Sequence, residues 1–504
     1  MDDNHENRLR DTALEIKLNS KTPQSSYQKN NSLKKNIFIR DNLIIDISRN
    51  FLDRRIFKDL IELANQLKIN KSIQDIFKNK YVSKTESKTV SHIHLRNISG
   101  FKKSLEKILK IYDQVKEGLL RSHTKEKFLY IVYVGIGGSL IGPRVLSESL
   151  RDYHDDIFKC YYVSSVDCSE MDDVLKNCDI NKTLFIFASK SFTTKEVLLN
   201  LSYIKSRIKS KKELRDIMKS NFIAITANIS NAKKEGFPTS KIISFSKNIP
   251  GRFSLTSVIS MPVLFEIGKK NYLDFFKGIN KMDNHVKTSK YENNIPLVLA
   301  LISIWNINFL DKKVLSICPY NYRLRNIVDH LQQQEMESNG KSYDIDGKRI
   351  YFPTSPIVFG QRGSECQHSY FQMIHQGDSE LSIDFIGVIN KNNPTASQFL
   401  LSNMIAQADL CFAGQKNKPA YKTINNGTPN NIILLKNLSP ESMGMLLSLY
   451  EHKVFLEGLL WKINSFDQWG VEQGKILAKK IQSSFRKKHK NTNSLISIVS
   501  KLFG

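Results

Sequence analysis

Two stretches of this sequence have the same order: an apolar strand, a loop rich in glycine, serine or threonine, and then a predicted helix. In the first, the apolar run 128–134 leads into 135–139, which reads G-I-G-G-S. In the second, 184–188 leads into 189–194, which reads S-K-S-F-T-T. Such loops offer free backbone N–H groups, hydroxyls and a helix N-terminus to an anion. The sequence therefore predicts an α/β fold that binds a small phosphorylated ligand.

The alternation of strand and helix continues beyond these loops. A further strand is expected at 222–226, with helices between the strands, which is typical of a parallel α/β sheet. The pattern restarts with strands expected at 314–317, 356–359 and 382–386. Helices are expected at 57–67, 105–119, 255–267, 322–337, 367–375, 440–461 and 467–487. This indicates two α/β runs with helical segments before and after them.

Length and composition limit the class of protein. The 504 residues suffice for two or three domains. The most apolar long stretch, 443–461, is interrupted by Glu451, Lys453 and Glu457, so no membrane span is expected. The polar N-terminus lacks a signal sequence, which favours a cytoplasmic location. The six cysteines have no metal-like spacing and are expected to be reduced thiols.

The net charge of +26 is unusual. It is compatible with binding to nucleic acid or an anionic surface, or with a composition drifting toward Lys, Asn and Ile. The excess is diffuse, with dense runs only at 205–212 and 486–490, and no nucleic-acid motif accompanies it. We therefore expect no nucleic-acid partner.

The two loops are not equally strong anion sites. The loop 189–194 has four hydroxyls and Lys190 at a helix start, although a Ser/Thr-rich N-cap turn has the same composition. The loop 135–139 lacks the Gly-Lys-Ser/Thr of a Walker A motif and the third glycine of a dinucleotide fingerprint. This loop is equally well interpreted as an anion-binding loop or as a tight turn between a strand and a helix.

Two carboxylates, Glu335 and Glu337, fall near the end of a predicted helix whose C-cap is Asn339-Gly340. The negative end of the helix dipole disfavours an ionised carboxylate there by ~0.3–1 kcal/mol. A carboxylate that accepts a proton readily suits a general base. The alternative is an ordinary solvated helix end.

Four other residues are candidates for a role in the site. His368 and His375 are seven positions apart, about 10 Å along a helix, which is too far for one metal ion. Either one of them is an acid–base group, or both have core and capping roles. Arg252, after Pro-Gly, is either an anion clamp or a surface arginine. Lys475 lies two turns into the last long predicted helix. It is either a site residue or an ordinary exposed lysine.

Together these segments resemble the glucose-6-phosphate isomerase (phosphoglucose isomerase) family. The matching pieces, in the family's order between about residues 84 and 480, are G-I-G-G-S-L-I-G-P, F-A-S-K-S-F-T-T-K-E, G-R-F-S-L, Q-E-M-E-S-N-G-K, Q-H-S-Y-F-Q-M-I-H-Q-G, L-Y-E-H-K-V-F and N-S-F-D-Q-W-G-V-E-Q-G-K. The resemblance implies two sugar-isomerase (SIS) parallel-sheet α/β sandwich domains with helical N- and C-terminal extensions. It also implies a homodimer with shared active sites, and neither a metal nor an organic cofactor.

These domains are expected in a definite order along the chain. We expect 1–110 to be a polar N-terminus and a helical segment packed on the larger domain. The range 111–270 would be the first SIS domain, 271–490 the second with the C-terminal helices, and 491–504 a tail.

The resemblance also implies an activity, the reversible conversion of D-glucose 6-phosphate to D-fructose 6-phosphate in glycolysis and gluconeogenesis. Glu337 is similar to the family base that moves a proton between C2 and C1 through a cis-enediol(ate). Arg252 would stabilise the charge on that intermediate. His368, supplied by the partner subunit in the family pattern, would assist ring opening, with Lys475 nearby. The implied substrate-binding residues are Ser189, Lys190, Ser191 and Thr194 for the phosphate, and Gly138, Ser139, Gln333 and Gln468 for the sugar or the phosphate.

The sequence departs from the family pattern near these residues. Ser191 stands where the family usually has Thr, and Thr256 where a large aromatic is common. The segment 361–366 reads Q-R-G-S-E-C instead of E-P-G-T-N-G, and the family's late arginine is missing near Thr428. None of these changes removes an implied catalytic residue. They bear on rate and fine specificity more than on the type of reaction.

Two alternative functions remain. A dual phosphoglucose/phosphomannose isomerase would share the site and differ only in how the pocket accepts the C2 epimer. A non-catalytic SIS-type sugar-phosphate sensor would not need Glu337, His368, Arg252 and Lys475 together.

Overall fold

The structure is a computed structural model that describes residues 3–19, 36–96, 102–378, 380–485 and 495–502. The chain forms two compact units, Met1–Ser465 and Phe466–Gly504. The basic run 486–490 and part of the expected tail 491–504 lie outside the described residues.

The first sheet of the larger unit has five strands, all parallel, in the order β6-β5-β7-β8-β9. Their bounds are β5 Tyr130–Val134, β6 Lys159–Val163, β7 Thr183–Ala188, β8 Phe222–Thr226 and β9 Ile242–Ser244. The central strand β7 is buried at every position, as its unbroken apolar sequence predicts for a strand covered on both faces. The expected strands at 128–134, 184–188 and 222–226 are confirmed, and β6 and β9 were not predicted.

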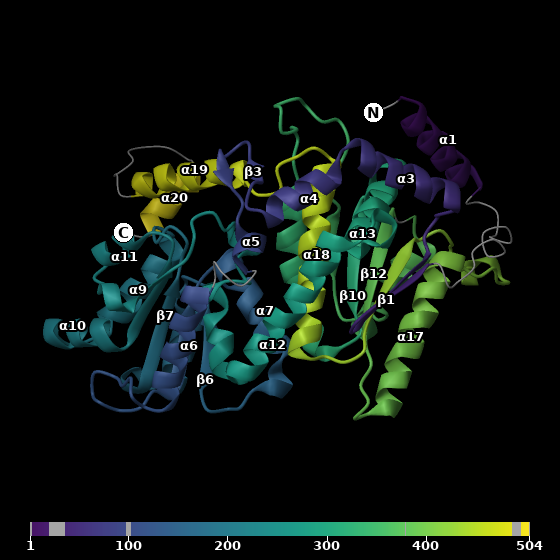
Figure 1. Cartoon of the computed structure of the whole chain (residues 1–504). Coiled ribbons are helices and arrows are strands. Elements are labelled where there is room, and N and C mark those ends of the chain that lie inside the picture. The colour runs from purple at the N-terminus through teal and green to yellow at the C-terminus, as the bar shows by residue number, and fades with distance from the viewer. Residues whose placement is uncertain (1–2, 20–35, 97–101, 379, 486–494, 503–504) are drawn as a thin grey trace. The chain divides into compact units, whose positions relative to one another are not determined.

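Helices cover both faces of this sheet (Figure 1). One face packs against α8 Ser169–Asn177, α9 Lys195–Ser206 and α10 Lys211–Ser220 in a single apolar cluster. The other face is covered by α7 Ile141–Ser149 and the long helix α12 Met261–Thr288, which kinks at Gly268.

The second sheet has six strands in the order β1-β2-β13-β12-β10-β11. The strands β10 Val314–Pro319, β11 Ile357–Gly360, β12 Leu381–Val388 and β13 Asn430–Leu435 are parallel to one another. The strands β1 Ile37–Arg40 and β2 Leu43–Arg49 pair antiparallel at the edge. The predicted two-sheet α/β class is therefore confirmed, with two antiparallel strands that the sequence analysis did not predict.

The second sheet is also covered on both faces. The helix α17 Pro394–Ala413 packs on one face through the apolar cluster that includes Phe385 and Met404. On the other face, Tyr450 of α18 Pro440–Leu460 donates its hydroxyl hydrogen to Asp384 at 2.9 Å. The helix α13 Ile295–Ile304 packs against α18 (Figure 1).

The remaining helices and strands lie before, between and after the sheets. They are α1 Asp3–Asn19, α3 Arg54–Gln66, α4 Ile69–Phe77, β3 Val82–Ser83, β4 Lys88–Thr89, α5 His92–Arg96, α6 Lys102–Lys116, α11 Ile229–Lys234, α14 Ile327–Gln332, α15 Gly363–Cys366, α16 Phe371–Gln376, α19 Trp469–Phe485 and α20 Leu495–Leu502. None of the described helices has both the length and the apolar character needed to cross a bilayer.

Two predicted helices are broken in the structure. The stretch 322–337 becomes a short turn, the α-helix α14 and a π-helical turn, Gln333–Glu337, although the helix still ends just before Gly340 as predicted. The stretch 367–375 begins as a turn and becomes helical only at Phe371. Both breaks lie at candidate site residues, where local geometry commonly departs from regular helix.

Candidate active site

The glycine loop after β5 packs directly on the segment that carries Arg252. A Cβ atom at Gly138 would lie 2.3 Å from the carbonyl oxygen of Gly251 and 2.6 Å from the backbone nitrogen of Arg252. Only glycine permits two backbones to approach so closely. Ser139 is fixed through its carbonyl, which accepts a hydrogen bond from the Tyr133 hydroxyl at 2.7 Å. This loop therefore determines where the Arg252 backbone lies.

The hydroxyl loop after β7 has a different geometry. Ser189 is buried, and its hydroxyl pairs with that of Thr194 at 2.8 Å and accepts from the backbone N–H of Phe192 at 3.1 Å. Ser191 is exposed and pairs with the Thr193 hydroxyl at 2.7 Å. The hydroxyls and N–H groups are thus held in a turn at the start of α9, as an anion site requires.

Lys190 adds positive charge to this loop. Burial lowers its pKa below the usual value; Glu86 opposes the shift, and the positive charges of Lys88 and Arg252 add to it. Cations held close together in a partly buried place favour an anion between them, because a bound anion relieves their mutual repulsion. This electrostatic coupling associates Lys190 with Arg252.

Arg252 is buried in the short 3₁₀ turn Gly251–Phe253. Its Nε donates to Ser338 Oγ at 2.6 Å, and its Nη2 donates to the carbonyl of Ser465 at 2.5 Å. Its Nη1 lies 3.7 Å from Glu337 Oε1. The guanidinium is therefore held by neutral groups on two sides and lies beside the Glu337 carboxylate.

Glu337 is the last residue of the π-helical turn, and its side chain is 27% exposed. Its Oε2 accepts a hydrogen bond from Gln333 Nε2 at 3.0 Å. That amide also lies close to the glycine loop, because a Cβ at Gly137 would be 3.3 Å from it. A partly exposed carboxylate oriented by an amide and a guanidinium can exchange a proton with a ligand.

The structure therefore brings together four of the predicted residues: Glu337, Arg252, Gln333 and Gly138. A base, a fixed cation and a nearby hydroxyl loop form an arrangement suited to moving a proton on a phosphorylated ligand while stabilising a developing oxyanion.

His368 is not joined to this group. It lies on an exposed turn between α15 and α16, and its backbone N–H donates to the carbonyl of Glu365 at 3.0 Å. Among the contacts of the described residues, none links its side chain to Glu337 or Arg252. The sequence pattern that suggested a helix face for His368 was wrong, because the helix begins only at Phe371.

Lys475 and Gln468 belong to the smaller unit. Lys475 lies on α19, where its Nζ forms an exposed ion pair with Glu472 Oε1 at 2.8 Å. Gln468 directly precedes that helix. The roles of these two residues stay predictions.

Sequence reasoning missed the groups that hold Arg252. Ser338 and Ser465 were not singled out, although each stands inside a motif already recognised, M-E-S-N-G-K and N-S-F-D-Q-W-G. Glu335 was considered only as a carboxylate at the helix end, and Asn339 only as part of the C-cap. Motif membership was the available signal, but it does not say which groups face each other.

Comparison with known proteins gives consistent relatives. A family model described as "Phosphoglucose isomerase" matches residues 46–498. A glucose-6-phosphate isomerase of Buchnera aphidicola subsp. Schizaphis graminum is 34% identical over 492 residues, covering 91% of this chain and 88% of the relative. One from Campylobacter jejuni subsp. doylei is 35% identical over 497 residues, covering 90% of each chain.

Solved structures agree with these relatives. The crystal structure of a glucose-6-phosphate isomerase from Chlamydia trachomatis has a TM-score of 0.83 at 27% identity, covering 97% of this chain and 98% of the other. A hypothetical protein from Thermus thermophilus has a TM-score of 0.61 at 21% identity, covering 86% of this chain and 100% of the other, and shares the fold.

Proposed function

The chain belongs to the phosphoglucose isomerase family, and on that premise we propose that it interconverts D-glucose 6-phosphate and D-fructose 6-phosphate. The observation that carries the proposal is the placement of Glu337 beside the buried Arg252, with Gln333 orienting the carboxylate. This is the minimum that an aldose–ketose isomerisation by proton transfer requires.

The hydroxyl loop supplies the grip on the phosphate. Ser189, Ser191 and Thr194, with the loop's backbone N–H groups, would donate to phosphate oxygens, and Lys190 would add a charge-assisted contact. Holding the phosphate places C1 and C2 of the open-chain sugar at a fixed distance from the loop. Such positioning converts proton transfer into an effectively intramolecular step.

Proton transfer is assigned to Glu337. Its carboxylate takes the proton from C2 of the aldose, the C–H electron pair forms the C1=C2 double bond, and the carbonyl oxygen O1 becomes the enediol(ate) oxygen. Arg252 stabilises that negative charge. Return of the proton to C1, with transfer of the hydroxyl proton from O2 to O1, gives the ketose.

Ring opening is assigned to His368 of the partner subunit, with Lys475 nearby. This extends the proposal to a homodimer with shared active sites, in keeping with the exposed position of the His368 turn. Gly138, Ser139 and Gln468 are proposed to line the sugar or the phosphate. The activity would serve glycolysis and gluconeogenesis in the cytoplasm.

The decisive experiment replaces Glu337 by Gln. We expect Glu337→Gln to lose about 10³-fold or more in kcat while fructose 6-phosphate binding, measured by calorimetry, stays within about threefold, because only the proton acceptor is removed. The matched control is Glu213→Gln, a glutamate in the first turn of α10. Normal turnover by Glu337→Gln would refute its role as the base.

An assay with mannose 6-phosphate distinguishes a dual phosphoglucose/phosphomannose isomerase from an enzyme that accepts only glucose 6-phosphate. Turnover of this epimer by the purified wild-type protein at a rate comparable to glucose 6-phosphate would support that alternative. The non-catalytic sensor is not favoured by the family membership, and it predicts no isomerase activity at all.

A further inference from the structure

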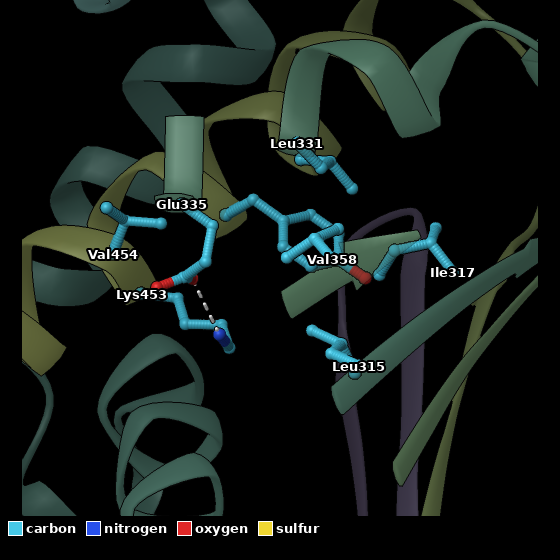
Figure 2. A pocket seen from close by; sticks show the side chains of 8 residues that line it. Leu315, Ile317, Leu331, Glu335, Val358, Lys453 and Val454 are labelled. Carbon is cyan, nitrogen blue, oxygen red and sulfur yellow. Dashed lines mark hydrogen bonds and ion pairs between the residues drawn. The ribbon is translucent and has the colours of Figure 1, made fainter. Parts of the chain in front are cut away.

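A buried charged cluster lies directly behind the catalytic turn. Glu335, two residues before Glu337, is 3% exposed. Its Oε2 accepts from Lys453 Nζ at 3.2 Å, and its Oε1 accepts from Asn339 Nδ2 at 3.0 Å. Figure 2 shows Lys453 pointing toward the Glu335 carboxylate.

Apolar residues surround this contact. Leu315, Leu331, Val358 and Val454 line a small cavity beside Glu335 and Lys453 (Figure 2). The ion pair is therefore shielded from solvent, and its geometry is set by packing rather than by exchange with water.

Lys453 is shared between two buried carboxyl groups. Lys453 Nζ also donates to Glu457 Oε1 at 2.5 Å. Burial and the neighbouring charge of Glu335 raise the pKa of Glu457 well above its usual range. Burial acts to lower the pKa of Lys453, but the neighbouring carboxyl groups outweigh it and hold the pKa above the usual value. Lys453 therefore joins Glu335 of the π-helical turn to Glu457 of its own helix.

A chain of hydrogen bonds connects the cluster to the active site. Asn339 Oδ1 accepts from Ser465 Oγ at 2.8 Å, and the Ser465 carbonyl accepts from Arg252 Nη2 at 2.5 Å. Arg252 Nε in turn donates to Ser338 Oγ, next to Glu337 in the chain. The cluster is thus connected to Glu337 through the π-helical turn and to Arg252 through Ser465.

We propose that Glu335, Lys453 and Asn339 are positioning residues that lock the π-helical turn against α18 and so maintain the Glu337–Arg252 geometry. The inference rests on the proposed function and deepens it. A π-helical turn is a local departure from the regular α-helix on either side of it. A buried ion pair adds little stability, but it can select one backbone arrangement of such a turn over another. None of the three residues needs to touch the substrate.

The test replaces both partners of the ion pair at once. In the double variant Glu335→Gln/Lys453→Met, neither Glu335 nor Lys453 is left charged without its partner. We expect kcat to fall by about 100-fold, as for a displacement of about 1 Å. KM and the calorimetric Kd for fructose 6-phosphate should stay within about threefold, and the thermal midpoint should change little.

A matched control removes another ion pair of the same helix. Lys281 Nζ lies 2.6 Å from Glu441 Oε1 in the first turn of α18. Lys281→Met/Glu441→Gln makes the same chemical change at the other end of the helix, and kcat is expected to stay within about twofold. Equal losses in both double variants, or wild-type kcat in the first, would overturn the proposal.

A single variant keeps the test valid if the double variant does not fold. Glu335→Gln keeps the shape and can accept one of the two hydrogen bonds, but it removes the charge and the second acceptor, and a fall of about tenfold in kcat at unchanged KM is expected. An unchanged kcat contradicts the positioning role. If the wild-type protein has no isomerase activity, the proposed function is refuted, and the positioning role with it. If the wild-type protein is active and Glu335→Gln has the same kcat, only the positioning role is refuted.

Discussion

The two strand–loop–helix segments of the first sheet have the same order of elements, but their loops make different contacts. The glycine loop 135–139 is pressed backbone to backbone against Gly251 and Arg252. The hydroxyl loop 189–194 is anchored by the buried Phe192 and leaves Ser191 exposed. Similar sequence order therefore predicted neighbouring sites but not their roles: one loop positions the arginine, and the other is suited to hold an anion.

The difference arises from the neighbours that each loop meets in space. Strands β5 and β7 are adjacent in the sheet, so both loops emerge at the same edge. The glycine loop meets the turn that carries Arg252, and a side chain at Gly138 would collide with that turn. The comparison predicts that changes in the first loop impair kcat and stability together, whereas changes in the second impair binding.

Within the comparison of the two loops, the largest effect is expected for Gly138→Ala. Its Cβ would overlap the Gly251 carbonyl at 2.3 Å, so the backbone carrying Arg252 must shift. We expect kcat/KM to fall by about 100-fold and the free energy of unfolding by about 1–3 kcal/mol. Steady-state kinetics and urea unfolding measure both. Gly470→Ala, where a Cβ meets nothing, is the control; wild-type kinetics in Gly138→Ala would contradict the positioning role of the glycine loop.

The next effect is a pH dependence of the free energy of unfolding that arises from Glu266, which contacts β6 beside β5. Glu266 on α12 accepts from the Tyr162 hydroxyl of β6 at 2.8 Å, and burial raises its pKa to about 7. Between its unfolded pKa and pH 7 the folded state keeps a proton that the unfolded state releases. The free energy of unfolding contributed by this group therefore falls as pH rises through that window, by up to about 3 kcal/mol.

The measurement compares urea unfolding of wild type and Glu266→Gln from pH 4.5 to 8. The difference between the two isolates Glu266 from other titrating groups and should grow in favour of the variant as the pH rises. Hydrogen exchange should show faster opening at the glycine loop than at the hydroxyl loop at high pH. A difference that does not depend on pH would refute the titration of Glu266.

A smaller effect is expected for Lys190→Met in the hydroxyl loop. Loss of one charge-assisted contact to phosphate is worth about 1.5–3 kcal/mol, so KM should rise about 10–100-fold with kcat within about threefold. Lys195→Met, at the start of α9, is the control for general loss of charge. A fall in kcat without a change in KM would assign Lys190 to the chemical step instead.

The smallest effect is expected for Ser189→Ala. The variant loses the bond to Thr194 and the one from the Phe192 N–H, at about 1 kcal/mol for a typical hydrogen bond. Substrate binding should weaken by about tenfold or less, as calorimetry would show. Stronger loss than in Lys190→Met would mean that the hydroxyls rather than the lysine dominate the anion site.

Much of this architecture could be predicted from local pattern. Continuous apolar runs identified β7 and β8, and helical periodicity identified α3, α6, α18 and α19. The strand β2 was missed because it pairs with β13, far away in the sequence, and β1 joins the sheet through β2. The π-helical turn was missed because its geometry depends on contacts with α18 rather than on its own residues.

Local sequence was enough to identify the family, the α/β class and the types of side chain present: a carboxylate, an arginine and a loop of hydroxyls. These depend on short motifs and local periodicity. The folded chain places Arg252 at 3.7 Å from Glu337 and pairs Glu335 with Lys453 behind them. Those distances join residues more than eighty positions apart, and packing of whole helices and sheets sets them, because no local pattern encodes a long-range separation.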